Sequence, residues 1–189
     1  MCHEKHKIIG KLLADLRKIE YTFHNAERTR HMTYEELREE VRSANLVLVG
    51  LGENLQGDRT SFYQALAGLL ERKDYFIVSL SENRKELEAA GLLPEQITVP
   101  LSEEEGQESW DRYLRWLSFT LNQKLCILEL GVGFDHPKII RFPFEKTCYF
   151  NQKSRYIRIH RNFPQLSAEI AGRGVSIQED PTILLTVKQ

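Results

Sequence analysis

Two glycine-rich turns are the first features of this sequence that could do chemistry. The run Gly50–Asn54 follows the apolar residues 46–49, and the run Gly131–Gly133 follows the apolar residues 125–130. Glycines placed directly after a buried strand let the backbone come close to a pyrophosphate and offer free amides to it. The first turn lacks the third glycine of the dinucleotide-binding fingerprint. The two turns together predict a nucleotide-phosphate site, and turns without any ligand are the alternative.

Ionisable side chains near predicted strand ends are candidate acids and bases. Glu53 places a carboxylate where a phosphate would sit, which is unfavourable unless the side chain points away or bonds a ribose hydroxyl. Glu129 lies within an otherwise apolar strand. We interpret it as a structural anchor for a neighbouring loop in preference to a catalytic group. His160 could stack on or hydrogen-bond an adenosine, or cap the sheet. The candidate acids and bases are Glu53, Glu82, His136 and His160.

Metal-binding and disulfide-forming residues are sparse. The cysteines are too few and too scattered for a disulfide framework, and no Cys-x-x-Cys pair that could hold zinc occurs. Cys2, His3 and His6 could bind a metal, but side chains at a chain terminus are poorly preorganised. We therefore expect a reduced protein without a zinc site.

Composition excludes several classes of function. The chain has 189 residues, of which 41% are hydrophobic and 28% charged, as expected for one soluble domain with a sizeable core. The formal net charge of -1 provides no global positive field for nucleic acid or an anionic membrane. No apolar run approaches the ~20 residues of a transmembrane helix, and the first residues lack the apolar stretch of a secretory signal. We expect a cytoplasmic protein that binds neither nucleic acid nor membrane.

Apolar runs alternate with amphipathic ones along the chain, which predicts alternating strands and helices. Thr33 and Glu36 have the spacing of a capping box at a helix start. Strands are expected at residues 46–49, 75–79, 97–99, 125–130, 155–160 and 175–178. Helices are expected at 33–43, 61–72, 82–90, 108–122, 136–141 and 144–150, with 182–187 as a strand or a helical turn. The helix at 108–122 is expected to bury Trp110, Tyr113, Leu114, Leu117 and Leu121.

These elements predict an α/β fold with a single doubly wound, Rossmann-like parallel sheet of five to six strands over residues 32–189. Continuous hydrophobic strands favour a parallel sheet covered by helices on both faces. Ligands bind such sheets at the carboxyl ends of the strands, near the point where the strand order reverses. Residues 1–31 are predicted to form an N-terminal helical extension that packs on the domain or on a second copy, giving a homodimer. Its apolar stripe comprises Ile8, Ile9, Leu12, Leu13, Leu16 and Ile19.

The segment Leu128–Phe144 resembles the Glu-Leu-Gly-Val-Gly-Phe/Tyr-Asn-Thr-Pro segment of sirtuins, most closely that of the macrodomain-linked bacterial sirtuins. Supporting likenesses follow in the same order and spacing from about residue 33 to residue 180. The resemblance implies a Rossmann-like sheet that binds NAD. The family's known activities are NAD-dependent protein deacylation and ADP-ribosylation. The supporting segments are Val49–Leu55, Lys73–Val78, Ala90–Ile97 and Ile157–His160.

The sequence departs from the family where the family does its chemistry. The family's catalytic histidine, or glutamine in the macrodomain-linked group, falls on Leu101, which cannot accept a proton. The four-cysteine zinc module is replaced by residues 103–107. The Asn and Asp of the family's Thr-x-Asn-x-Asp motif are replaced by Ser81 and Asn83, and its ribose-binding asparagine by His160. We therefore do not expect a peptide deacylase of the family's type.

Three functions remain open. We predict a catalytically degenerate, sirtuin-like domain that binds NAD or ADP-ribose and acts as a sensor, scaffold or partner subunit. One alternative is a NAD-consuming enzyme, a glycohydrolase or ADP-ribosyltransferase, with catalytic residues outside the family pattern. A second alternative is a protein-interaction module without a nucleotide, which an acidic phosphate loop favours. The expected nucleotide-binding residues are Gly50, Leu51, Gly52, Glu53, Asn54, Ser79, Ser81, Gly131, Val132, Gly133 and His160.

Overall fold

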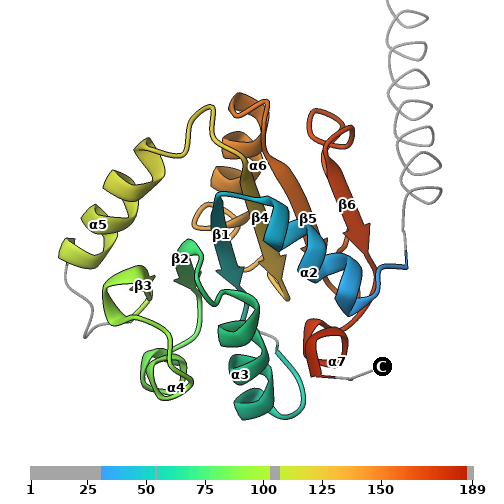
Figure 1. Cartoon of the computed structure of the whole chain (residues 1–189). Coiled ribbons are helices and arrows are strands. Elements are labelled where there is room, and N and C mark those ends of the chain that lie inside the picture. The colour runs from blue at the N-terminus through green and yellow to red at the C-terminus, as the bar shows by residue number, and fades with distance from the viewer. Residues whose placement is uncertain (1–30, 54, 103–106, 187–189) are drawn as a thin grey trace, which may run out of the picture.

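A six-stranded, all-parallel sheet forms the centre of the computed structural model, which describes residues 31–53, 55–102 and 107–186 (Figure 1). The strand order is β3-β2-β1-β4-β5-β6, and every neighbouring pair runs parallel. The predicted α/β, doubly wound fold is therefore confirmed. The strands are β1 (Leu46–Leu51), β2 (Asp74–Ser79), β3 (Ile97–Thr98), β4 (Leu125–Leu130), β5 (Arg155–Ile159) and β6 (Gly174–Ile177).

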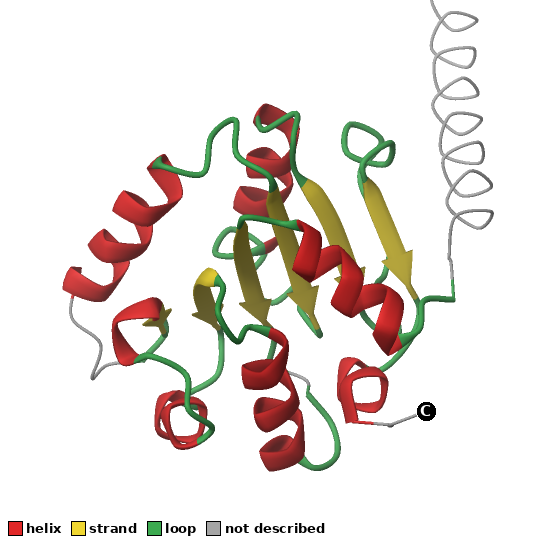
Figure 2. Ribbon diagram, viewed as in Figure 1, coloured by secondary structure: helices red, strands yellow, loops and turns green. Residues whose placement is uncertain are grey.

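Helices cover both faces of the sheet (Figure 2). Buried side chains of α2, α3, α4 and α7 join the core on one face, and those of α5 and α6 join the core on the other. Each β-strand between them is buried on both sides, which is why the strands are apolar without alternation. The helices are α2 (Tyr34–Ser43), α3 (Arg59–Leu69), α4 (Arg84–Ala89), α5 (Gln107–Ser118), α6 (Arg141–Phe150) and α7 (Pro181–Thr186), with a 3₁₀ turn η1 (Pro94–Gln96).

Caps set the helix starts. The amide of Glu36 donates to Thr33 Oγ1 at 3.2 Å, and the amide of Thr33 donates to the Glu36 carboxylate at 2.9 Å, which confirms the predicted capping box. Helix α3 begins at Arg59, earlier than predicted, because the Asp58 carboxylate accepts the amides of Thr60 and Ser61.

Helix α5 was predicted too long. Asn122 adopts a positive φ of 63°, a conformation incompatible with helix, and α5 ends at Ser118. The Asn151 amide group holds the turn that follows by donating to the carbonyls of Thr120 and Gln123. The predicted buried set is accordingly wrong in part: Tyr113 is buried, Trp110 and Leu117 are partly buried, and Leu114 and Leu121 are 47% and 56% exposed.

The structure corrects the predicted helix at 136–141 and decides between strand and helix for the C-terminal segment. Residues 136–140 form turns instead of a helix, because their backbone bonds run from the amide of Ile139 to His136 and from that of Phe142 to Pro137, outside the helical series. The C-terminal segment is the short helix α7, whose start is capped by the Asp180 carboxylate on the amide of Thr182 at 2.9 Å.

The predicted N-terminal helix at residues 1–31, with the dimer contact expected of it, lies outside the described residues except for His31. Among the helices that the structure describes, none combines the length and the apolar character needed to cross a membrane.

Candidate functional site

The strand order reverses between β1 and β4 at the centre of the sheet. The chain leaves β1 toward α3 on one face and leaves β4 toward α6 on the other. The loops after these two strands, residues 52–58 and 131–140, therefore lie at the topological switch point, where doubly wound sheets bind ligands. Both glycine turns lie there, as the sequence predicted.

Three glycines of the two turns, Gly50, Gly52 and Gly131, are favoured by contacts or backbone conformation within the protein. A Cβ on Gly52 would lie 1.8 Å from the carbonyl oxygen of Gly131, and a Cβ on Gly50 would lie 2.5 Å from Ile140 Cγ2. Gly131 itself has a φ of +67°, which favours glycine. Close packing between the two turns is thus a sufficient cause of the glycine pattern, which sequence alone cannot separate from phosphate binding.

The backbone amides in these turns are partly used. The amide of Gly52 donates to the carbonyl of Leu130, and the amide of Gly131 donates to that of Ile159, each at 2.9 Å. These bonds extend the sheet past the strand ends, so neither amide is free for a phosphate.

The remaining predicted residues of the turns differ in what they can present to a ligand. The side chains of Leu51 and Val132 are buried in the core, one on each face of the sheet, which leaves their backbone for a ligand. Gly133 is buried beside them. Asn54 lies outside the described residues.

The turn after β2 holds a buried hydrogen-bond network. Ser79 Oγ donates to Asn83 Oδ1 at 2.8 Å, and Asn83 Nδ2 donates to Tyr63 Oη at 2.7 Å. Ser81 Oγ donates to the carbonyl of Gly52 at 3.4 Å, so this turn is tied to the turn after β1. Of the two serines predicted to contact a ligand, Ser79 is buried and hydrogen-bonded within the protein. Ser81 is only partly buried.

Glu53 meets side chains from the loop after β4. Its Oε1 lies 3.5 Å from His136 Nε2, and its carboxyl group hydrogen-bonds Asp135. Burial, and then the charge and hydrogen bond of Asp135, raise the pKa of Glu53, while the nearby His136 lowers it. A carboxyl pair with an imidazole thus lies directly at the switch point.

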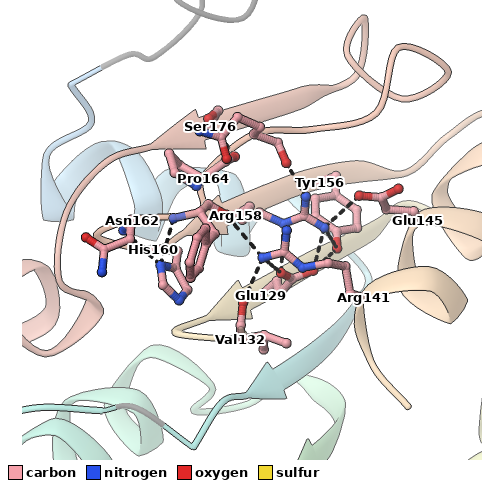
Figure 3. Close-up of polar contacts among 12 residues, drawn as sticks. Glu129, Val132, Arg141, Glu145, Tyr156, Arg158, His160, Asn162, Pro164 and Ser176 are labelled. Carbon is pink, nitrogen blue, oxygen red and sulfur yellow. Dashed lines mark hydrogen bonds and ion pairs between the residues drawn. The ribbon is translucent and has the colours of Figure 1, made fainter. Parts of the chain in front are cut away.

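Glu129 anchors a buried charge network behind the site (Figure 3). Arg158 Nε donates to its Oε1 at 2.7 Å and Arg158 Nη2 to its Oε2 at 2.8 Å. Tyr156 donates its hydroxyl proton to the same carboxylate. Burial, and then the charge of Glu129, raise the pKa of Tyr156 well above its ordinary value, so this hydroxyl keeps its proton. Glu129 has no exposed surface, which fits the predicted structural anchor.

Arg141 links this network to the site loops. Its Nη2 lies 3.2 Å from Glu129 Oε1 and donates to the carbonyls of Val132, at 2.7 Å, and Phe163, at 3.1 Å. Its guanidinium carbon lies 4.2 Å above the centre of the Phe134 ring. The anchor therefore fixes the loops after β4 and β5 against each other.

His160 is the residue directly after β5. Its Nδ1 accepts the amides of Asn162 and Phe163 at 3.0 Å each, which places the ring proton on Nε2. Burial, and then the charge of Arg141, lower the pKa of His160, so the ring is neutral. Nε2 is buried and has no hydrogen-bond partner among the described residues. In Figure 3 the ring turns away from the Glu129 network.

Two exposed aromatic rings lie beside His160. Phe163 packs on the His160 ring with centroids 5.1 Å apart and on Phe134 with centroids 5.3 Å apart. Phe134 and Phe163 remain 53% and 42% exposed. The three rings of Phe134, Phe163 and His160, here the aromatic shelf, are inclined at 76° and 47° to one another, and the two exposed rings lie next to a buried polar donor.

The described residues contain no group of three or more His, Cys, Asp or Glu side chains placed to hold a metal ion. Cys126 and Cys148 are buried and free. Burial raises the pKa of Cys126 to about 12, so it is a packing residue and not a nucleophile.

Comparison with known proteins gives a limited result. No family model matches the chain. A stretch of 75 residues, 40% of this chain, is 25% identical to a Staphylococcus aureus protein named protein ADP-ribosyltransferase. The match spans about a quarter of that protein, 24% of its length.

Sequence reasoning missed several residues of the site. Phe134 and Asp135 lie in the resembled segment Leu128–Phe144 but were not singled out as site residues, and Phe163 gave no signal by type or spacing, because the partners of all three come from other strand ends. Arg141 and Arg158 could have been suspected, since a carboxylate inside an apolar strand requires a buried cation.

Proposed function

We propose that this domain binds NAD or ADP-ribose across the carboxyl ends of β1, β4 and β5, as a sirtuin-like domain without the family's deacylase chemistry. The observation that carries the proposal is the buried Nε2–H group of His160, which lacks a partner among the described residues. An unsatisfied buried donor costs free energy, and a ligand that accepts its hydrogen bond recovers that free energy. Ribose hydroxyls and purine nitrogens are suitable acceptors.

The surroundings of His160 support a nucleotide in particular. The exposed ring of Phe163 or of Phe134 offers a base a face to stack on, and base–aromatic stacking contributes about 1–3 kcal/mol. The switch point next to it is the usual ligand position of the fold. The Staphylococcus aureus relative, by its name, transfers ADP-ribose, which makes a ligand containing ADP-ribose the natural candidate.

The proposed role is that of a sensor, scaffold or partner subunit that responds to the nucleotide. Leu101 stands where the resembled family has its base, and a leucine side chain cannot accept a proton. Nucleotide binding would then change the domain's partners without deacylation.

Isothermal titration of the full chain with NAD and with ADP-ribose tests the proposal. We expect micromolar binding, near -8 kcal/mol. His160→Ala should weaken binding about tenfold, because one buried hydrogen bond and one shelf surface are lost. His31→Ala, a histidine at the other end of the described chain, should leave the affinity unchanged.

If neither NAD nor ADP-ribose gives a heat of binding or shifts the melting temperature, the proposal that the domain binds a nucleotide is wrong. That result would favour the interaction module, for which the close packing of Gly52 on Gly131 is the supporting observation. Equal affinity of His160→Ala and wild type would instead place the nucleotide away from β5.

A further inference from the structure

Helix α6 carries apolar side chains on two opposite faces. Phe144 and Cys148 are buried in the core on that side of the sheet. Phe142, Tyr149 and Phe150 lie on the outward face and are 53%, 50% and 57% exposed. A surface helix ordinarily places polar residues on the side away from the core. The outward face of α6 therefore has the composition of a face that another element covers.

A groove runs along this outward face. It has a volume of about 360 Å³ and lies between α6 and the segment 167–170, which precedes β6. Tyr149 and Phe150 form an edge-to-face pair in its lining, with ring centroids 5.3 Å apart. An apolar groove of this kind can take up the apolar side chains of an amphipathic helix.

The chain itself contains an occupant of matching length. The 30 residues that precede His31 lie outside the described part of the structure. Their sequence holds the apolar stripe at residues 8–19, for which a helix is predicted. A helix over this stripe would be about 17 Å long, and α6, with 10 residues, is about 15 Å long. The stripe can therefore lie along the whole of α6.

The point where the described chain begins is within reach of the groove. Met32 is buried in the core on the α2 face of the sheet, and α6 covers the opposite face. Residues 20–30 link the stripe to this point and can span up to about 36 Å. The radius of gyration expected for a domain of this size is about 15 Å, so the link can pass around the edge of the sheet. A tether this short gives an effective concentration on the order of millimolar, which favours the chain's own segment over that of a second copy.

Charges at the groove also suit a basic segment. Residues 5–19 contain five Lys or Arg residues and one Asp. Glu169 presents an exposed carboxylate at the groove. Glu145, which pairs with Arg158 at 2.7 Å, keeps 18% of its side chain exposed. Lys146 adds an opposing positive charge, so apolar contact contributes most of the affinity and the charges favour one orientation of the segment.

We propose that residues 5–20 of this chain bind the groove along their own α6, with the apolar stripe against Phe142, Tyr149 and Phe150. The segment is then an intramolecular cover for an apolar face, and the dimer contact expected from the sequence is not needed to bury its stripe. The inference does not depend on nucleotide binding.

A nitroxide spin label on Cys2 of the full chain tests the proposal by nuclear magnetic resonance. Cys126 and Cys148 are buried, so the label is directed to Cys2. Amide signals of α6 and of residues 167–170 should lose more than about half of their intensity relative to the reduced label, because tethering keeps the bound state dominant. Amide signals of α4, on the opposite face of the sheet, should keep their intensity.

Two matched pairs of variants locate the contact. Phe150→Lys should raise the α6 intensities about twofold, because a charge replaces an apolar contact. Phe119→Lys should not, since Phe119 is 77% exposed and lies outside the groove lining. Leu12→Lys should act like Phe150→Lys, whereas Ala14→Lys, on the opposite face of the predicted helix, should have no effect. Leu12 precedes the domain at 32–189, so this second pair tests the proposal even if Phe150→Lys does not fold.

A mixed sample distinguishes the chain's own segment from that of a second copy. Isotope-labelled chain without nitroxide, mixed with nitroxide-labelled chain without isotope, should show no loss of α6 signals. Loss in this mixture would overturn intramolecular binding and assign the groove to a second copy. Signal loss centred on α2, or no loss anywhere, would overturn binding at the groove. Loss that persists in both Phe150→Lys and Leu12→Lys would overturn the contact between the stripe and α6.

Discussion

A methyl group on Gly52 would lie 1.8 Å from the carbonyl oxygen of Gly131, so the turns that end β1 and β4 are in direct backbone contact. The same methyl group would lie 2.6 Å from the amide nitrogen of Val132. No side-chain rotation relieves a clash between a Cβ and backbone atoms. The switch point is therefore built on two interlocked turns.

Gly52→Ala should destabilise the domain by about 3 kcal/mol, because the two turns must separate to admit the methyl group. Urea unfolding measures the change. Gly68→Ala is the control: Gly68 lies in α3, and a methyl group there would meet no atom within 4 Å, so helix propensity should stabilise by about 0.5–1 kcal/mol. Equal effects of the two substitutions would contradict this account.

Glu129→Gln should cost about 3 kcal/mol or more of unfolding free energy. The neutral amide removes the fully buried countercharge that Arg158 and Arg141 share, and Arg158 keeps only its ion pair with Glu145 at 2.7 Å. Chemical denaturation compares this variant with Glu35→Gln, whose carboxylate pairs with Arg38 in an exposed ion pair 3.6 Å long. The Glu35 variant should change stability by less than about 0.5 kcal/mol. A comparably small effect of Glu129→Gln would show that the network is dispensable.

Tyr63→Phe should destabilise by about 1–2 kcal/mol, since Asn83 Nδ2 loses the hydroxyl that accepts its hydrogen bond in a buried setting. Thermal melting followed by circular dichroism is sufficient to detect the change. Tyr149→Phe removes an equivalent hydroxyl from a half-exposed ring and should have little effect. Identical melting temperatures of the Tyr63 variant and wild type would argue against the network after β2.

Because of His160, the free energy of unfolding should depend on pH at pH values below about 6.5, the ordinary pKa of a histidine. Its pKa is lowered in the folded state by burial and by the charge of Arg141, so the unfolded chain takes up the proton first. Stability is therefore full above pH 6.5 and falls as the pH drops toward the folded-state pKa.

The variant His160→Asn removes that titration and retains a side-chain oxygen for the amides of Asn162 and Phe163. The loss of melting temperature between pH 8 and pH 5.5 should be smaller for the variant than for wild type. A variant with the same or a greater loss would show that other groups govern this pH range.

Local sequence patterns sufficed for most of the fold. Unbroken apolar runs such as Leu125–Leu130 are expected of strands buried on both faces, and Thr33 with Glu36 sets a helix start through contacts three residues apart. Alternation of these strands with helices predicts a parallel sheet, and every neighbouring pair of strands is parallel. Helix α5 was the main error, because its end is fixed by Asn151, a residue distant in sequence.

The sequence by itself thus determined the class of fold, the position of the glycine turns and the presence of one buried carboxylate that needed a partner. Tertiary structure alone decided which residues meet. Glu53 reaches Asp135 and His136, and His160 keeps a donor without a partner among the described residues, because parallel strands far apart in sequence end at one edge of the sheet. Local propensity acts over a few residues, whereas a site is assembled by long-range strand pairing, and that pairing is visible only once the chain is folded.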